Sequence, residues 1–138
     1  QYETLARELG LLERVHFLGW RNDRKALLEV CDICLLPSRY EPFGTVIAEA
    51  WSMRRPLVAA SADGARQYVR DNENGAVFPI DDETALAQRI MQIAGDAAFA
   101  ARLVEQGYRD YERLFSRDIV IDRLLDIYRT VIAARRAA

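Results

Sequence analysis

Residues 37–53 read PSRYEPFGTVIAEAWSM, and this stretch decides the fold. A continuous apolar run, ICLL at residues 33–36, ends directly before it, and a short polar loop then leads to Gly44. An amphipathic segment begins at Thr45, so the order predicts a buried strand, a tight loop and the N-terminus of a helix. Ligands of open α/β sheets bind beyond the carboxyl ends of the strands, and helix N-termini offer N–H groups that suit phosphate. The stretch therefore predicts either a ligand-binding loop or only a well-capped helix.

The rest of the chain alternates between helical and strand patterns on both sides of this stretch. We expect helices at residues 2–9, about 22–30, 45–53, 65–69, 81–94, 97–113 and 117–134, and strands at residues 15–18, 33–36, 57–60 and 76–78. Alternating elements with continuous apolar strands are typical of a parallel sheet that is covered on both faces. The sequence therefore predicts an α/β, Rossmann-like domain with a parallel sheet and C-terminal helices. An apolar stripe on residues 117–134 predicts that the last helix packs against other residues.

Composition limits the function classes that the chain can belong to. The 138 residues carry a formal net charge of −2, which gives no field for a polyanion and argues against nucleic acid. No apolar run approaches the roughly 20 residues of a membrane-spanning helix. The chain begins with QYE, which already resembles the inside of a helix, so we expect a piece of a longer protein.

Cys31 and Cys34 form a C-x-x-C pair, a spacing found in redox sites and in halves of zinc sites. No second pair exists, and His16 is the one histidine of the chain. Both cysteines fall where a helix ends and a buried strand begins, and there they serve as small apolar residues. We therefore expect no metal site, free thiols and a reducing compartment.

Two carboxylates flank the expected helix start, Glu41 in the loop and Glu49 inside the helix. Glycoside hydrolases use two carboxyl groups about 5 to 9.5 Å apart. At the helical rise of about 1.5 Å per residue, these two groups would lie about 8–12 Å apart. That separation disfavours a hydrolase and fits two groups that hold different parts of one extended ligand.

The N–H groups of Gly44, Thr45 and Val46 would be free donors at the helix start, where a diphosphate could sit. Glu41 and Glu49 could then accept hydrogen bonds from sugar hydroxyls on its two sides. The alternative is that one glutamate is an exposed loop residue and the other a solvated helix residue.

The motifs resemble those of retaining GT-B glycosyltransferases of the large family 4 type. Residues 37–51 are similar to the E-x7-E signature of that family, with Glu41 and Glu49 as its glutamates. Further similar pieces follow in the same order: LGL at 9–11, VHFLG at 15–19, CDICLLPS at 31–38, RPLVA at 55–59, Gly64, ENG at 73–75 and DD at 81–82. The resemblance covers residues 2 to about 94. It implies one partial GT-B C-terminal domain, with a nucleotide-sugar-binding part at residues 1–94 and C-terminal helices at residues 95–138.

The resemblance also implies roles for individual residues. Glu41 would contact the donor hexose on the transfer face, which makes it the catalytic candidate. Phe43 and Gly44 would offer backbone N–H groups to sugar hydroxyls, while Thr45 and Val46 would lie at the diphosphate.

The remaining implied contacts lie on either side of this loop. Glu49 would bind the ribose hydroxyls, and Gly64 would lie in a loop that faces the same cleft. Trp20 and Arg21 would lie near the base. No cofactor is implied, because the nucleotide-diphosphate sugar is itself the donor substrate. No metal is implied either, because the helix end and cationic side chains would replace it and the sequence shows no cluster of ligands.

The sequence departs from the pattern of the family at several positions. Arg54 stands where glycine is usual, Thr45 where leucine is commoner, and Gln67 where glutamate is common. The first glycine-rich strand-loop with its Arg and Lys, the central strand of the sheet and the N-terminal acceptor domain have no counterpart in this chain. We therefore expect the chain alone to be inactive.

The resemblance implies that the intact protein transfers a hexose with retention to a glycan or lipid-linked acceptor, as in lipopolysaccharide or polysaccharide biosynthesis. Its partners would be the nucleotide sugar and its own acceptor domain. It would be cytoplasmic and could associate peripherally with the inner face of the membrane. The alternative is a non-catalytic, Rossmann-like module that binds nucleotide or another protein.

Overall fold

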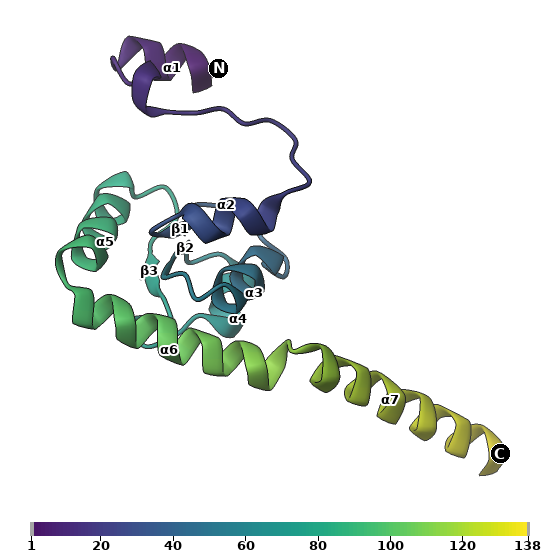
Figure 1. The fold of residues 1–138 in the computed structure, drawn as a ribbon. Coiled ribbons are helices and arrows are strands. Elements are labelled where there is room, and N and C mark those ends of the chain that lie inside the picture. The colour runs from purple at the N-terminus through teal and green to yellow at the C-terminus, as the bar shows by residue number, and fades with distance from the viewer. Residues whose placement is uncertain (1, 138) are drawn as a thin grey trace.

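The computed structural model describes residues 2–137, shown in Figure 1. The elements in chain order are α1 (Tyr2–Glu8), the 3-10 helix η1 (Leu12–Arg14), α2 (Arg24–Val30), β1 (Cys34–Leu36), α3 (Thr45–Ser52), β2 (Leu57–Ala60), α4 (Asp63–Tyr68), β3 (Ala76–Phe78), α5 (Glu83–Gly95), α6 (Ala97–Leu114) and α7 (Arg117–Ala137). The expected helices all form, with small shifts at their ends.

The three strands form one parallel sheet in the order β1-β2-β3. Leu35 lies opposite Val58, and Ala59 lies opposite Val77, which sets the register. Each pair of neighbours is joined by a helical crossover, α3 between β1 and β2, and α4 between β2 and β3. The predicted α/β class with a parallel sheet is therefore confirmed, and all three strands end at the same edge of the sheet.

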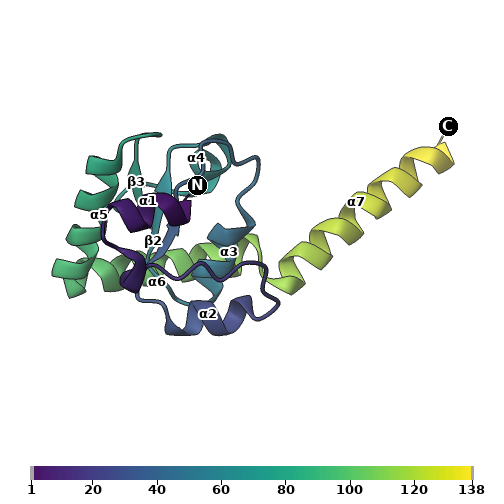
Figure 2. The same cartoon turned by 90° about the horizontal axis from the view of Figure 1, so that it is seen from above.

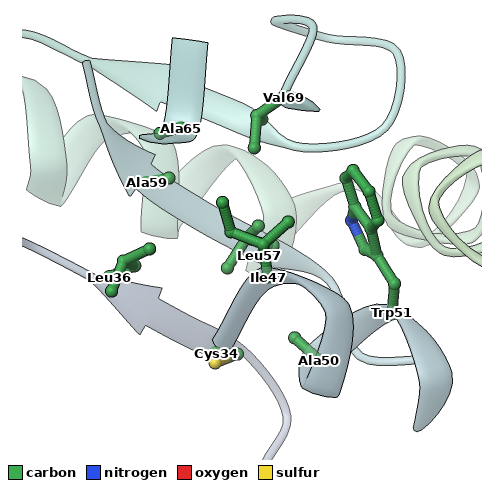
Figure 3. Packing of buried hydrophobic residues seen from close by; sticks show 9 residues of the cluster. All are labelled: Cys34, Leu36, Ile47, Ala50, Trp51, Leu57, Ala59, Ala65 and Val69. Atoms are coloured by element: carbon green, nitrogen blue, oxygen red, sulfur yellow. The ribbon is translucent and has the colours of Figure 1, made fainter. Parts of the chain in front are cut away.

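The core lies on both faces of β2, whose four residues are all buried. Leu57 and Ala59 belong to a cluster with Ile47 and Trp51 of α3, drawn in Figure 3. Val58 and Ala60 belong to a second cluster formed with residues of α5 and α6. A strand that is apolar at every position is thus explained by helices on both of its faces.

Helix α3 faces the core with Ile47, Ala50 and Trp51, which are spaced three and four positions apart. Burying a large apolar side chain contributes about 1.5–3 kcal/mol, so this face fixes α3 firmly on the sheet. The helix that carries Glu49 and follows the loop of Glu41 is therefore held firmly against the sheet.

Residues 15–18 were predicted to form a fourth strand, and this prediction is wrong for the described structure. The segment is extended and exposed, and it pairs with no strand within residues 2–137. Strand patterning makes a segment suited to a sheet, but the ladder needs a neighbour to accept its hydrogen bonds. Figure 1 shows this segment running alone between η1 and α2.

The expectation that the last helix packs against other residues is also wrong for the described chain. Helix α7 forms as expected, but it projects away from the body in Figures 1 and 2. Its large apolar side chains from Val120 to Ile132 are exposed. No helix within residues 2–137 is both long and apolar enough to cross a bilayer.

Candidate functional site

The loop at residues 41–44 joins β1 to α3 and carries the first glutamate. Gly44 is the N-cap of α3 and has a φ of 83°, a left-handed conformation that suits glycine. Its N–H group donates a hydrogen bond to Glu41 Oε1 at 2.9 Å. A Cβ at Gly44 would lie 2.6 Å from Ile47 Cδ1, so a side chain has no room there. The Glu41 carboxylate therefore holds the N-cap residue of α3 with one of its two oxygens. The N–H group of Gly44 was expected to be free for a ligand, but in this structure it is already bonded to Glu41.

Gly64 supports this loop from the next strand-to-helix connection. Its N–H group donates to the backbone oxygen of Glu41 at 2.7 Å. A Cβ at Gly64 would lie 2.5 Å from that same oxygen and 2.8 Å from the carbonyl carbon of Phe43. Gly64 was expected in a loop that faces the cleft, but it is buried in the first turn of α4, which begins earlier than predicted. It contacts the 41–44 loop directly.

Phe43 holds the loop from the other side through its ring. The ring meets Tyr68 edge-on with 5.4 Å between centroids, and Phe115 edge-on at 6.0 Å. The residue remains 44% exposed, so these contacts cover only part of its surface. The side chain of Phe43 is thus used for packing.

Thr45 and Val46 form the first turn of α3. Thr45 is exposed, whereas the side chain of Val46 packs partly against the core cluster of α3 and β2. The first N–H groups of a helix have no acceptor inside the helix, and they carry its positive dipole end. The structure therefore places the N-terminus of a helix directly beside Glu41.

Glu49 lies in the second turn of α3 and lines a hollow of about 310 Å³. Its Oε1 atom forms an ion pair with Arg24 Nη1 of α2 at 3.0 Å. Asn22 and Lys25 line the same hollow, together with Ser52 from α3. Glu49 is therefore neither a solvated surface residue nor a core residue, but part of a polar wall between two helices.

Trp20 and Arg21 line a neighbouring hollow of about 390 Å³. Trp20 is 93% exposed, and Arg21 Nε donates to Asp23 Oδ1 at 2.7 Å. That hydrogen bond raises the pKa of Arg21 above its ordinary value and lowers the pKa of Asp23. Asn22 and Arg24 line both hollows, so the expected base contacts and Glu49 lie in adjoining parts of one surface.

The structure thus brings the expected residues together in two groups that α3 connects. Glu41, Phe43, Gly44 and Gly64 form the loop and its support at the start of the helix. Glu49 lies farther along α3, beside the surface that carries Trp20 and Arg21. Chemically, this arrangement offers two carboxylate acceptors on either side of a set of backbone donors, which suits an extended polyhydroxy anion.

The buried network around Asp110 was not anticipated from the sequence. Asp110 Oδ2 accepts hydrogen bonds from Arg70 Nη2 at 2.7 Å and from Asn74 Nδ2 at 2.8 Å. Asn74 offers its backbone oxygen to Trp51 Nε1 at 2.9 Å. A signal was available in the sequence, because Asp110 falls on the inward face of α6 with Phe99, Leu103 and Gly107. A lone carboxylate on an apolar helix face indicates a buried, paired charge.

The two cysteines behave as the structural interpretation predicts. Both are free, and Cys34 is buried in the cluster around α3. Burial, followed by the neighbouring Cys31 and Glu49, raises the pKa of Cys34 to about 11, and burial also raises the pKa of Cys31. Both thiols are therefore protonated near neutral pH. Within residues 2–137, no three His, Cys, Asp or Glu side chains are grouped so that they could hold a metal ion.

A protein-family model described as "Glycosyl transferases group 1" matches residues 1–110 of the chain. The lipopolysaccharide core biosynthesis glycosyltransferase LpsE of Rhizobium meliloti is 36% identical over 123 residues, which are 89% of this chain and 36% of LpsE. LpsD of the same organism, also named as a lipopolysaccharide core biosynthesis glycosyltransferase, is 30% identical over 98% of the chain and 39% of LpsD.

Solved structures show the same fold. Sucrose-phosphate synthase from Thermosynechococcus elongatus superposes with a TM-score of 0.89 and 32% identity, over 96% of this chain and 34% of that protein. HepE of Anabaena, solved in complex with UDP-glucose, superposes with a TM-score of 0.88 and 29% identity, over 94% of this chain and 36% of HepE. The chain therefore spans about a third of the length of the proteins that it matches.

Proposed function

The chain belongs to the glycosyl transferases group 1 family, and from this premise we propose that it forms the donor-binding part of a glycosyltransferase. The intact enzyme would move a hexose, with retention, from a nucleotide-diphosphate sugar to a glycan or lipid-linked acceptor. The UDP-glucose complex of HepE supports a nucleotide sugar as donor, and the names of LpsE and LpsD support a lipopolysaccharide acceptor.

The observation that carries the proposal is the placement of two carboxylates, one in the loop before α3 and one in the second turn of that helix, on either side of its first N–H groups. Glu41 is held at the start of α3 by the N–H group of Gly44, and Glu49 projects from the second turn of the same helix. Sugar hydroxyls are natural donors to ionised carboxylates, and a diphosphate suits the N–H groups between them. One extended ligand with hydroxyls at both ends and phosphates in the middle satisfies all of these groups.

In the proposed reaction, the bond between the hexose and the diphosphate breaks while the acceptor oxygen attacks from the same side. Negative charge then grows on the departing diphosphate. The N–H groups at the start of α3 would stabilise this charge because they are already oriented and need no reorganisation. Glu41 would orient the hexose through its hydroxyls, and Glu49 would anchor the ribose. The proton of the acceptor would pass to an oxygen of the departing phosphate.

The polar wall beside Glu49 includes Arg24, and the proposal gives this arginine a role. Its ion pair occupies Oε1 of Glu49, so the other carboxylate oxygen would accept a ribose hydroxyl. Arg24 and Arg21 also place positive charge near the surface that would receive the base and ribose. Peripheral membrane association and a cytoplasmic location of the intact enzyme stay predictions.

Substitution of each glutamate in the full-length protein tests the proposal. A panel of nucleotide sugars identifies the donor, and Glu41→Ala should then lower kcat/KM about 100-fold, because a group that acts on the reacting sugar is lost. Glu49→Ala should raise the donor KM about tenfold or more, since a charge-assisted hydrogen bond is lost. Glu112→Ala, at an exposed position of α6, is the matched control.

Unchanged donor turnover in Glu41→Ala would refute the assignment of the site. Donor binding without any transfer would favour the alternative of a non-catalytic nucleotide-binding module. Retention is tested separately, by NMR of the anomeric configuration of the first product before it equilibrates.

A further inference from the structure

Four aromatic side chains from distant parts of the chain meet beside the 41–44 loop. Phe115, which directly follows α6, lies at their centre. Its ring is 5.0 Å from that of Tyr68, 6.0 Å from that of Phe43 and 6.4 Å from that of Trp51, measured between centroids. The Phe43 and Tyr68 contacts are edge-on, the geometry that the aromatic quadrupole favours.

The backbone at the corner between α6 and α7 holds Phe115 in this place. The N–H groups of Phe115 and Ser116 both donate to the backbone oxygen of Tyr111, at 2.8 and 3.0 Å. Arg123 of α7 reaches back to the carbonyl oxygens of Leu114 and Arg113, at 3.4 and 3.5 Å. The ring is therefore set by how the two last helices meet, and not by the 41–44 loop that it touches.

The 41–44 loop has few other anchors. The backbone is tied to Gly64 by one hydrogen bond, and the Glu41 side chain is tied to Gly44 by another. At the end of the loop, the N–H group of Ile47 donates to the backbone oxygen of Gly44 at 2.9 Å. The ring of Phe43 adds to these bonds; it is 44% exposed and rests on Tyr68 and Phe115 alone among the aromatic rings of the described residues. Without Phe115, the Phe43 ring would keep one edge-on contact and could swing toward solvent.

We propose that Phe115 is a positioning residue for the donor site, acting through Phe43 to hold Glu41 and the start of α3 in a geometry that binds the donor. The expected effect on donor kinetics rests on the proposed function, because it presupposes that Glu41 belongs to a donor site. Group placement within a fraction of an ångström decides the efficiency of transfer reactions, so a loosened loop weakens donor use without removing any contact group. The corner between α6 and α7 is thereby linked to the donor loop.

The test uses the full-length protein and two leucine substitutions. Phe115→Leu removes the ring beside the loop, and Phe99→Leu removes an aromatic ring from the opposite end of α6, where it packs with Ile93 and Leu103 in the other core cluster. Phe115→Tyr keeps the ring and serves as the rescue variant. Hydrogen exchange of the Gly44 and Gly64 amides is followed without donor, and donor KM, kcat and Tm are then measured for each variant.

Phe115→Leu should speed exchange of both amides about tenfold and raise the donor KM about tenfold, as expected from the loss of edge-on ring contacts. Phe115→Tyr should resemble the wild type in both readouts. Phe99→Leu should lower Tm at least as much as Phe115→Leu and leave the amides and the donor KM unchanged. Unchanged exchange in Phe115→Leu, or equal changes in Phe99→Leu, would overturn the proposal and make Phe115 a merely structural residue.

Phe43→Leu provides a second variant in case Phe115→Leu does not fold, because it removes the same contact from the exposed side. Its effects on exchange and KM should not add to those of Phe115→Leu in the double variant, since both break one interaction. Additive effects would contradict the inference. Normal donor kinetics in Glu41→Ala would instead refute the proposed function, and the exchange data would still decide the role of Phe115.

Discussion

Gly64 is the residue whose missing side chain matters most for the shape of the candidate site. The atoms that a Cβ would meet belong to the backbone of Glu41 and Phe43, and they cannot rotate away as a side chain could. An added methyl group must therefore displace the 41–44 loop itself. The same contact explains why the residue at position 64, shortly after the carboxyl end of β2, has no side chain.

Gly64→Ala should lower donor kcat/KM about tenfold or more, because the loop that carries Glu41 moves from its place over α4. Gly75→Ala is the matched control, since the nearest atoms that its Cβ would meet belong to Val69, at 2.7 Å from Cγ1, and to Leu57. Steady-state kinetics and Tm are measured for both variants of the full-length protein. Parallel losses of activity in the two variants would contradict a specific effect on the loop.

Asp110 predicts how stability responds to acid. Burial opposes its ionisation, but hydrogen bonds from Arg113, Asn74 and Arg70 outweigh burial and lower the pKa of Asp110 from 3.8 to about 2. The folded state thus favours the charged form. The resulting stabilisation is fully present above about pH 4, the unfolded pKa, and is lost as the pH falls toward 2.

Asp110→Asn should remove this part of the acid sensitivity and cost about 1.5–3 kcal/mol near neutral pH, because Arg70 and Arg113 lose the charged acceptor of their hydrogen bonds. Asp122→Asn, at an exposed position of α7, is the control. The urea midpoint of the full-length proteins is compared between pH 2.5 and 7. An unchanged pH profile in Asp110→Asn would contradict the assignment.

Residue types with a local geometric signature could be predicted from the sequence, and long-range partners could not. Gly44 was expected at the helix start because a glycine before an amphipathic run fits a cap, and it is the N-cap. Arg24 and Phe115 were missed because their contacts with Glu49 and Phe43 depend on how separate elements pack. Nothing in the spacing of the sequence records that packing.

Helices α3 and α6 cross where Trp51 lies against Gly107. The indole ring fills the space over the glycine, and its Nε1 atom donates to the backbone oxygen of Asn74. This crossing fixes α6 against the helix that carries Glu49, and it brings Asp110 to its partners one turn later. The contact therefore supports the candidate site through the packing of helices.

Gly107→Ala should destabilise the protein by about 1–3 kcal/mol, because the added methyl group overpacks against a buried ring. Gly95→Ala is the matched control, because Gly95 is also a helical glycine and its Cβ would meet nothing within 4 Å. That substitution should leave stability unchanged or raise it by up to about 1 kcal/mol, as the unfolded chain loses freedom. Urea denaturation distinguishes the two, and equal effects would show that the crossing tolerates a side chain.

At the scale of elements, periodicity predicted every α-helix and the three paired strands, because each signal is local. The three-residue 3-10 helix η1 was not predicted. The error concerned residues 15–18, whose strand pattern is correct but whose pairing depends on a neighbour that residues 2–137 do not provide. The apolar stripe of α7 is a similar case. A pattern predicts that a surface is suited to burial, whereas only the three-dimensional arrangement shows what covers it.

The whole molecule consists of a covered sheet from which both ends of the chain depart. Figure 1 shows the N-terminal part standing apart from the sheet, and Figures 1 and 2 show α7 projecting from it. Exposed large apolar residues gather on these two departing parts, at residues 15–20 and along α7. The chain spans only 36% of the length of LpsE. The proposed function therefore expects the remainder of the intact enzyme to cover both parts.

Limited trypsin digestion tests this expectation on the extended segment. In residues 1–138 expressed alone, cleavage should begin after Arg14 or Arg21, because unpaired extended backbone fits a protease without local unfolding. Arg89 is the internal control, since it lies in α5, donates to the backbone oxygen of Val77 at 3.0 Å and pairs with Asp71. The full-length protein should resist cleavage at Arg14 and Arg21 at the same protease concentration. Equal cleavage of both proteins at these arginines would show that the segment stays open in the intact enzyme, and the predicted fourth strand would then be wrong there as well.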